Sequence, residues 1–407
     1  MNTRMAEATR LTRSGRLEEA MALLRGSIPL RAADVANSPA FNVEQGPVAA
    51  GAQIIDMVPP LGGGEGSWTA PRAEEHPREA ATDPARSKGL RDLMDRLGQL
   101  GPGTNLPGLA GGLRSVAPAP LPDGARFEER TYTNQAGSRG YKLYVPSSYD
   151  SQPLPLIIML HGCTQSPDDF AAGTRMNELA EEYGFLVAYP GQPSSANSSR
   201  CWNWFSAGDQ LRDRGEPSLI AGITQQIMRD FRVETGSVFV AGLSAGGAAA
   251  AIMGSVYPDL YAATGIHSGL ACGAAKDVPS AFAAMRQGGS GLTASRPGQR
   301  PPRSIVFHGD RDKTVNPVNA DQVIAQSKGE TELRTVVSRG QSVGGISYTR
   351  STHADESGRI MLEQWVLHGA GHAWSGGSAA GSYTDPKGPD ASGEMVRFFL
   401  ERPNTPS

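Results

Sequence analysis

The fold of this chain follows from residues 237–246, whose sequence is SVFVAGLSAG. A short run rich in β-forming residues leads into GLSAG at 242–246, and a run of alanines follows it. Between a buried strand and a helix, a G-x-S-x-G pentapeptide forms a tight turn that exposes the hydroxyl of its serine, and the amino terminus of the helix favours negative charge beside it. This context predicts that Ser244 is a nucleophile. The alternative is a glycine-rich turn in which the serine is incidental.

The sequence around this turn alternates between β-rich and helical runs from residue 126 to residue 403. The run LPLIIML at 154–160 is apolar throughout, as in a strand buried on both faces of a sheet. Strands that alternate with helices pair in parallel, so residues 126–403 are predicted to form one α/β domain with a mostly parallel, doubly wound sheet. The other predicted strands are residues 127–132, 141–145, 185–189, 238–241, 263–267, 304–308 and 361–367, and the predicted helices are 169–183, 217–231, 246–256, 317–326 and 392–401.

The first 125 residues differ from this domain in composition. The chain of 407 residues contains 50 glycines and 30 prolines, and residues 31–125 are rich enough in both to predict a flexible linker with a short amphipathic helix near 87–100. Residues 1–30 predict a helical hairpin similar to half of a tetratricopeptide repeat, a unit that cannot bury its own apolar face. We expect this extension to be either a structural appendage or a docking element for a granule, a partner or a second subunit.

The composition excludes several other classes of protein. A net charge of −3 and a pI near 6.2 indicate no basic surface for nucleic acid, and no apolar run approaches the ~18 residues of a membrane span. The amino terminus has no signal-peptide pattern and three cysteines are too few for a disulfide scaffold, so we expect a cytoplasmic protein, with leaderless export to the extracellular space as the alternative. The spacing of His, Cys and carboxylate residues predicts no metal site, and no cofactor is expected.

A serine nucleophile needs a base and an oriented acid, which in this type of fold follow it in the order Asp, His. Asp310 and Asp312 both follow the predicted strand 304–308, at the carboxyl end where such sites are built. Asp312 is the favoured acid because it lies far enough into the loop to turn back toward the site, whereas Asp310 is expected to brace the turn. The alternative is that both aspartates only cap the turn of this loop.

Three histidines follow Asp312 in the sequence. His353 lies in a polar segment typical of a hairpin tip, and His368 lies at the end of a strand, where a structural role is expected. His372 is flanked by glycines in the loop after the last predicted strand, so it can reach the serine, and we predict it to be the base. In this fold the oxyanion hole combines one backbone N–H from the loop after strand 154–160 with that of the residue after the nucleophile, which predicts Cys163 and Ala245.

Five motifs follow one another along the chain: LHGCTQ at 160–165, CWNWF at 201–205, GLSAG at 242–246, HGDRD at 308–312 and GHAWSGG at 371–377. Together, from about residue 125 to the carboxyl terminus, they resemble the polyhydroxybutyrate (PHB) depolymerase-like esterase family of α/β hydrolases. The resemblance implies that Ser244, Asp312 and His372 form a catalytic triad that hydrolyses short-chain hydroxyalkanoate esters or oligomers through an acyl-enzyme.

Other activities remain open beside this resemblance. The family's relatives include feruloyl and acetylxylan esterases, and a peptidase on the same fold is a further alternative. A granule-binding or scaffold protein with a vestigial hydrolase domain is an alternative of another class. Secreted depolymerases usually add a carboxyl-terminal polymer-binding module that this chain lacks, so oligomers, soluble esters or amorphous granules are expected rather than crystalline polymer.

Aromatic and cysteine residues complete the predicted site. Trp202, Trp204 and Trp374 are predicted substrate contacts, because flat apolar walls at this end of the sheet suit an ester or polymer chain. Core packing is the alternative for Trp202 and Trp204. Cys163 and Cys201 lie on adjacent strand-end loops, where a disulfide would fix the oxyanion loop, but reduced thiols are equally expected in the cytosol.

Overall fold

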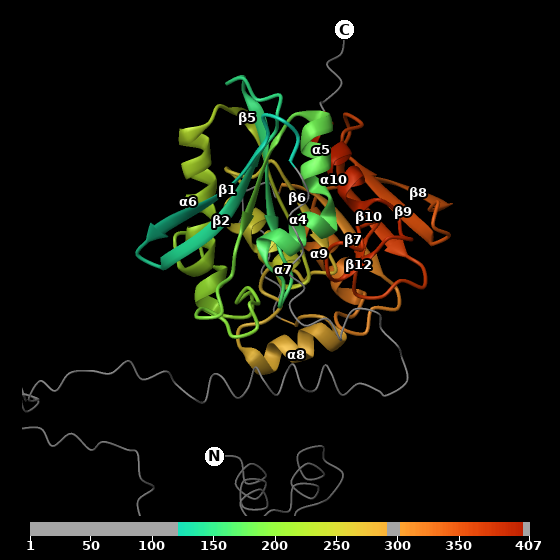
Figure 1. Ribbon diagram of the computed structural model, residues 1–407. Coiled ribbons are helices and arrows are strands. Elements are labelled where there is room, and N and C mark those ends of the chain that lie inside the picture. The colour runs from blue at the N-terminus through green and yellow to red at the C-terminus, as the bar shows by residue number, and fades with distance from the viewer. Residues whose placement is uncertain (1–120, 291–301, 402–407) are drawn as a thin grey trace, which may run out of the picture. The chain divides into compact units, whose positions relative to one another are not determined.

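A computed structural model of the protein describes residues 121–290 and 302–401, all of which fall within the unit Thr82–Ser407 (Figure 1). The predicted hairpin at 1–30, the linker up to residue 120 and its helix near 87–100 lie outside the described residues.

The described residues form one ten-stranded sheet in the order β1-β2-β4-β3-β5-β6-β7-β10-β9-β8, with a separate two-stranded sheet of β11 and β12 (Figure 1). The six strands from β4 to β10 pair in parallel, and two antiparallel strands extend the sheet at each edge. This arrangement confirms the predicted mostly parallel α/β sheet. The strands are β1 Arg126–Asn134, β2 Gly137–Val145, β3 Leu154–Leu160, β4 Leu186–Pro190, β5 Val233–Leu243, β6 Ala263–His267, β7 Arg303–Gly309, β8 Arg334–Gln341, β9 Ser347–Ala354, β10 Ile360–Leu367, β11 Trp374–Ser375 and β12 Thr384–Asp385.

Helices cover both faces of the sheet, so successive residues of the central strands enter different cores. In β3, Leu156 and Ile158 pack in the cluster that includes α6 and α7, whereas Ile157 and Met159 pack in the cluster that includes α4, α5 and α10. Burial on both faces explains why the sequence of β3 is apolar throughout. The helices are α4 Pro167–Thr174, α5 Met176–Tyr183, α6 Gly215–Asp230, α7 Ala245–Val256, α8 Val278–Gln287, α9 Val318–Lys328 and α10 Ala391–Leu400, with a short 3-10 helix η1 at Ala207–Gln210.

Several elements differ from the sequence prediction. The helix expected at 169–183 is two helices, because Arg175 takes a left-handed conformation (φ 58°) between α4 and α5. Strands β8 and β9 and helix α8 were not expected. Every residue of β8 is at least partly exposed, so its sequence carries no alternation of apolar and polar residues that would predict a strand. His353 lies within β9 rather than at a hairpin tip.

Helix α7 begins almost as soon as β5 ends, and two glycines make this possible. A Cβ at Gly246 would overlap the carbonyl of Leu160 at the end of β3, and a Cβ at Gly242 would overlap the backbone of Gly246. Only glycine allows the helix to start this close to the two strands. Between them, Ser244 has φ 57° and ψ −118°, a conformation that a residue with a side chain rarely adopts.

Among the described helices, none combines the length and the apolar character needed to cross a membrane.

Candidate active site

The residues predicted to act together follow three strands from the parallel part of the sheet. Ser244 follows β5, Asp312 lies three residues after β7, and His372 lies five residues after β10. The carboxyl ends of parallel strands meet at one edge of the sheet, where α/β proteins build their sites. β6 lies between β5 and β7, and the backbone N–H of Ser244 donates to the carbonyl of His267 at the end of that strand (2.9 Å).

His372 and Asp312 form a close, shielded pair. Nδ1 of His372 donates to Oδ2 of Asp312 at 2.6 Å, and the Asp312 side chain is fully buried. Its other oxygen accepts from the backbone N–H groups of Thr314 (2.8 Å) and Val315 (2.9 Å). Burial alone would raise the pKa of Asp312, but the charge of His372 and hydrogen bonds from His308 and His372 hold that pKa well below its ordinary value. The pair leaves Nε2 as the ring atom of His372 available to take a proton from a hydroxyl.

Asp310 has different partners from Asp312. Its carboxylate accepts from Nδ1 of His368 (2.9 Å) and from the backbone N–H of Gly369 (2.7 Å). Nε2 of His368 in turn lies 2.8 Å from the hydroxyl of Thr349 on β9. The structure therefore places Asp312 against His372 and makes Asp310 a brace for the turn after β10.

The loop after β3 leaves one backbone donor available. The N–H of Gly162 donates to Oε1 of Gln165 (2.9 Å), that of Thr164 to the carbonyl of Ser199 (2.7 Å), and that of Gln165 to the carbonyl of Gly162 (3.4 Å). Within residues 162–165, all of them described, the N–H of Cys163 is the one without a hydrogen bond. Ala245 is the first residue of α7, and the first N–H groups of a helix have no intrahelical acceptor. Both predicted oxyanion donors are thus available for a ligand.

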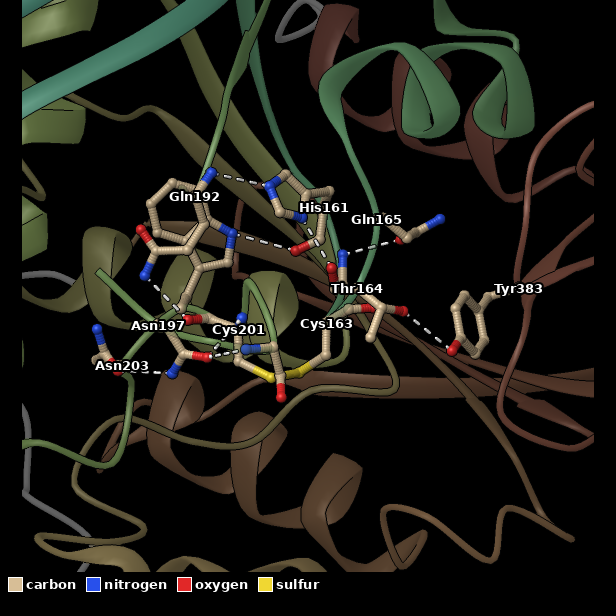
Figure 2. The surroundings of a disulfide bond; sticks show 12 residues. His161, Cys163, Thr164, Gln165, Gln192, Asn197, Cys201, Asn203 and Tyr383 are labelled. Atoms are coloured by element: carbon tan, nitrogen blue, oxygen red, sulfur yellow. Dashed lines mark hydrogen bonds between the residues drawn. A yellow bond between two sulfur atoms is a disulfide. The ribbon is translucent and has the colours of Figure 1, made fainter. Parts of the chain in front are cut away.

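A disulfide joins the loop after β3 to the loop after β4. Cys163 is bonded to Cys201, with their Cα atoms 4.2 Å apart. Hydrogen bonds reinforce this link. The backbone N–H of Gln192 donates to Nε2 of His161 at 3.1 Å (Figure 2), and Nε1 of Trp202 donates to the carbonyl of His161 at 3.1 Å. In the structure these two cysteines form a disulfide and are not free thiols.

A tyrosine holds the opposite side of the same loop. In Figure 2 the hydroxyl of Tyr383 points toward the hydroxyl of Thr164, at 3.1 Å. Nε2 of Gln165 donates to the carbonyl of Ser382 (3.0 Å). The loop that carries Cys163 is therefore bound both to the 197–203 segment and to the segment that follows His372.

The three tryptophans correct the prediction of substrate contacts. Trp202, Trp204 and Trp374 are only 0%, 7% and 1% exposed, so their rings have almost no surface for a ligand. The ring of Trp374 packs edge-on against Phe170, and its Nε1 donates to Ser392 (3.0 Å). All three rings pack in the hydrophobic cores, which is the alternative given for Trp202 and Trp204. The sequence places them in the right loops but does not show which way they face.

A buried carboxylate organises the loop that carries Cys201. Glu216 is 6% exposed and accepts hydrogen bonds from the backbone and side chain of Asn203 (both 2.7 Å) and from Gln192. Burial first, and the charge of Asp209 second, raise the pKa of Glu216 to about 7, against the opposite effect of its hydrogen bonds and of Arg139. No pattern in the sequence singles out this residue at the start of α6.

Two further histidines have no role that the spacing of the sequence predicts: His161, directly after β3, and His267, the last residue of β6. His161 and His267 are 1% and 0% exposed, and burial lowers their pKa values to about 4 and about 3. Both rings are therefore neutral at physiological pH, and each accepts a backbone hydrogen bond at Nε2. In the described part of the chain, no group of three His, Cys, Asp or Glu residues could hold a metal ion.

Comparison with known proteins identifies relatives of this chain. The family described as Esterase PHB depolymerase matches residues 139–331. Poly(3-hydroxyalkanoate) depolymerase C of Paucimonas lemoignei is 30% identical over 256 residues, which are 59% of this chain and 59% of that protein. Feruloyl esterase B of Neurospora crassa is 30% identical over 246 residues, 56% of this chain and 81% of that protein. A probable acetylxylan esterase A of Neosartorya fischeri is 29% identical over 213 residues, 48% of this chain and 56% of that protein.

Among solved structures, an acetyl xylan esterase from Aspergillus awamori superimposes with a TM-score of 0.49 at 23% identity, covering 60% of this chain and 94% of the other. The chain spans little more than half the length of the depolymerase and of the acetylxylan esterase that it matches. The chain belongs to the PHB depolymerase-like esterases, a family of α/β hydrolases that act on carboxylic esters.

We predict that loss of the Cys163–Cys201 bond lowers both stability and turnover. The bond closes a loop with a sequence separation of 38, which restricts the unfolded chain and raises the free energy of unfolding by up to about 4 kcal/mol. Without the bond, the backbone N–H of Cys163 is also less firmly held in place. Cys201→Ser should therefore unfold at a lower temperature and hydrolyse p-nitrophenyl butyrate more slowly than the wild type. Reducing agent should slow the wild type and a Cys272→Ala control alike, without slowing Cys201→Ser further. Unchanged turnover of wild-type protein whose reduction is verified by mass would contradict this prediction.

We also predict a pH effect on stability from Glu216. Its pKa is raised from 4.5 to about 7, so the native state binds this proton more tightly than the unfolded chain does. The free energy of unfolding should therefore fall as pH rises from about 4.5 to about 7, by up to roughly 3 kcal/mol from this group. Glu216→Gln cannot titrate, so urea unfolding at pH 5 and pH 8 should show a smaller difference than in the wild type. If the free energy of unfolding changed equally between pH 5 and pH 8 in the wild type and in Glu216→Gln, Glu216 would not titrate in this range.

Proposed function

We propose that this protein is a serine esterase whose triad is Ser244, His372 and Asp312. The observation that carries the proposal is the 2.6 Å bond between His372 and the fully buried, ionised Asp312, at the same edge of the sheet as Ser244. A carboxylate in this position keeps the proton of the imidazole on Nδ1 and stabilises the imidazolium that forms when Nε2 accepts a proton.

The proposed reaction has two steps. In the first, Oγ of Ser244 attacks the ester carbonyl while Nε2 of His372 takes its proton, and the oxyanion accepts hydrogen bonds from the N–H groups of Cys163 and Ala245. His372 then gives the proton to the leaving alcohol, and the carbon–oxygen bond to that alcohol breaks. In the second step a water molecule gives a proton to Nε2 of His372 as it attacks the acyl carbonyl. The bond between the acyl carbon and Oγ of Ser244 then breaks, His372 returns the proton to Oγ, and the acid leaves.

We propose short-chain hydroxyalkanoate esters or oligomers, of the polyhydroxybutyrate type, as the substrate class. The likeness to a protein named Poly(3-hydroxyalkanoate) depolymerase C supports this choice. A feruloyl or acetylxylan esterase activity is the second candidate, and it is supported by relatives of those names at 29–30% identity.

The disulfide supports an oxidising compartment as the place of action. Such bonds persist in secreted and periplasmic proteins and are rare in the cytosol. The Cys163–Cys201 bond therefore favours the extracellular alternative over the cytoplasmic location expected from the sequence. Docking of a granule, a partner or a second copy by residues 1–30 stays a prediction, because those residues lie outside the described structure.

The triad is tested by comparing two aspartates. Ser244→Ala should abolish hydrolysis of p-nitrophenyl butyrate, and Asp312→Asn should lower kcat by roughly 10⁴-fold, because the amide selects the wrong tautomer of His372. Asp310→Asn is the matched control: it removes a carboxylate from the same loop without touching His372, so its loss should be much smaller. A larger loss from Asp310→Asn than from Asp312→Asn, with both variants folded, would refute the assignment of the acid.

The substrate class is tested by a panel of hydroxybutyrate oligomers, acetylated xylan and methyl ferulate, with Ser244→Ala as the blank. We expect the highest kcat/KM on hydroxybutyrate oligomers. A higher value on acetylated xylan or methyl ferulate would favour the second candidate and leave the serine mechanism intact.

A further inference from the structure

His267 lies at the centre of the proposed site without belonging to the triad. It is the last residue of β6, the strand between β5 and β7, and it is completely buried. Its backbone carbonyl accepts the N–H of Ser244 (2.9 Å), and Nε2 of its ring accepts the backbone N–H of Ser375 (3.0 Å). His267 thus contacts both the turn that carries Ser244 and the loop that carries His372, because Ser375 lies in that loop three residues after His372.

Ring stacking extends these contacts to the third element of the site. The imidazole of His267 is stacked on the indole of Trp374 (centroids 5.1 Å apart) and, on β7, on the ring of Phe307 (5.8 Å, interplanar angle 9°). β7 leads directly into the loop of Asp312. The elements that supply the nucleophile, the acid and the base therefore all meet at His267.

The hydrogen bonds of the ring require one protonation state. Because Nε2 accepts a backbone N–H, it carries no proton, and the single ring proton lies on Nδ1, facing the hydroxyl of Ser268 (3.2 Å). Burial, with a smaller effect from the charges of His308 and His372, lowers the pKa of His267 to about 3. The ring of His267 is therefore a neutral acceptor for the Ser375 N–H at physiological pH.

We propose that His267 is a positioning residue, which holds the His372 loop at a fixed place relative to Ser244 through its bond to the Ser375 N–H. The inference rests on the proposed function, because it assigns His267 a role in aligning that triad. Its effect on the reaction should be geometric: displacement of a reacting group by about 1 Å can cost roughly 10²-fold in rate. The effect should fall on kcat, because His267 is buried and offers no surface to a substrate.

Two substitutions separate this role from simple filling of space. In His267→Gln, an amide oxygen can take the place of Nε2 and accept the Ser375 N–H. In His267→Asn, the shorter side chain reaches only as far as Nδ1, so the same polar group cannot make that bond. We expect His267→Asn to lower kcat by about 10- to 100-fold with KM within about twofold, and His267→Gln to recover most of the loss.

A role in packing alone would give a different result. Both variants lose the ring that stacks on Trp374 and Phe307, so in that case kcat would fall in each variant only as far as its stability falls. Equal kcat in the two variants, or a loss that falls on KM, would overturn the proposal. Melting temperatures of both variants, measured in parallel, show how much of any loss reflects unfolding.

Labelling of Ser244 by a fluorophosphonate makes the test independent of the ester chosen. Fast labelling of the wild type and of His267→Gln, with slow labelling of His267→Asn, would support the role of His267 even if every ester in the panel resisted hydrolysis. Failure of the substrate assignment is thus distinguishable from failure of this inference. Equal labelling of all three proteins would overturn the inference.

The ring itself can be observed in the wild type, without any substitution. In ¹⁵N-histidine NMR spectra at pH 7, His267 should be neutral, with its proton on Nδ1. A cationic ring, or one protonated at Nε2, could not accept the Ser375 N–H and would also overturn the proposal.

Discussion

The close approach of helix α7 to the ends of β3 and β5 is the constraint on which the rest of the site depends. Gly246 lies against the carbonyl of Leu160, where no Cβ fits, so α7 can begin one residue after Ser244. Ser244 lies in this turn at φ 57° and ψ −118°, and the first turn of the helix lies against the backbone of Leu160 and His161, directly before the loop that holds Cys163. Strain of this kind persists only where the surrounding structure fixes it. Here a ten-stranded sheet packed on both faces does so.

Polar groups that are buried and fully engaged hold the strand-end loops around this turn. The Asp312 carboxylate accepts two backbone N–H groups as well as His372, and two neutral histidines, His161 and His267, each accept a backbone N–H from a neighbouring loop. Such bonds are strong in a medium of low dielectric constant, and an unpaired partner would be costly, so they specify one arrangement of the loops. The disulfide between Cys163 and Cys201 adds a covalent link to the same network.

The sequence predicts those features of the fold that depend on the order and spacing of residues along the chain. The alternation of strands and helices predicted the mostly parallel sheet, and the apolar run of β3 predicted a strand buried on both faces. Motif order suggested the family to which the chain belongs. Strands β8 and β9 are not predicted because β8 is exposed along most of its length and β9, although partly buried, consists mainly of polar residues, so neither shows a hydrophobic alternation. Helix α8 is not predicted either.

The sequence by itself determined which chemical groups are present and at which ends of which strands they lie: a serine in a G-x-S-x-G turn, two aspartates after β7 and a glycine-flanked histidine after β10. The sequence favoured Asp312 over Asp310, but only the tertiary structure showed Asp312 in contact with His372, the three tryptophans buried in the cores, and Glu216 and His267 bonded to the strand-end loops. The physical reason is that periodicity along the chain reports local burial, whereas the direction of a loop side chain depends on packing between segments far apart in sequence. His267 and Ser375, which are 108 residues apart and bonded at 3.0 Å, illustrate that dependence.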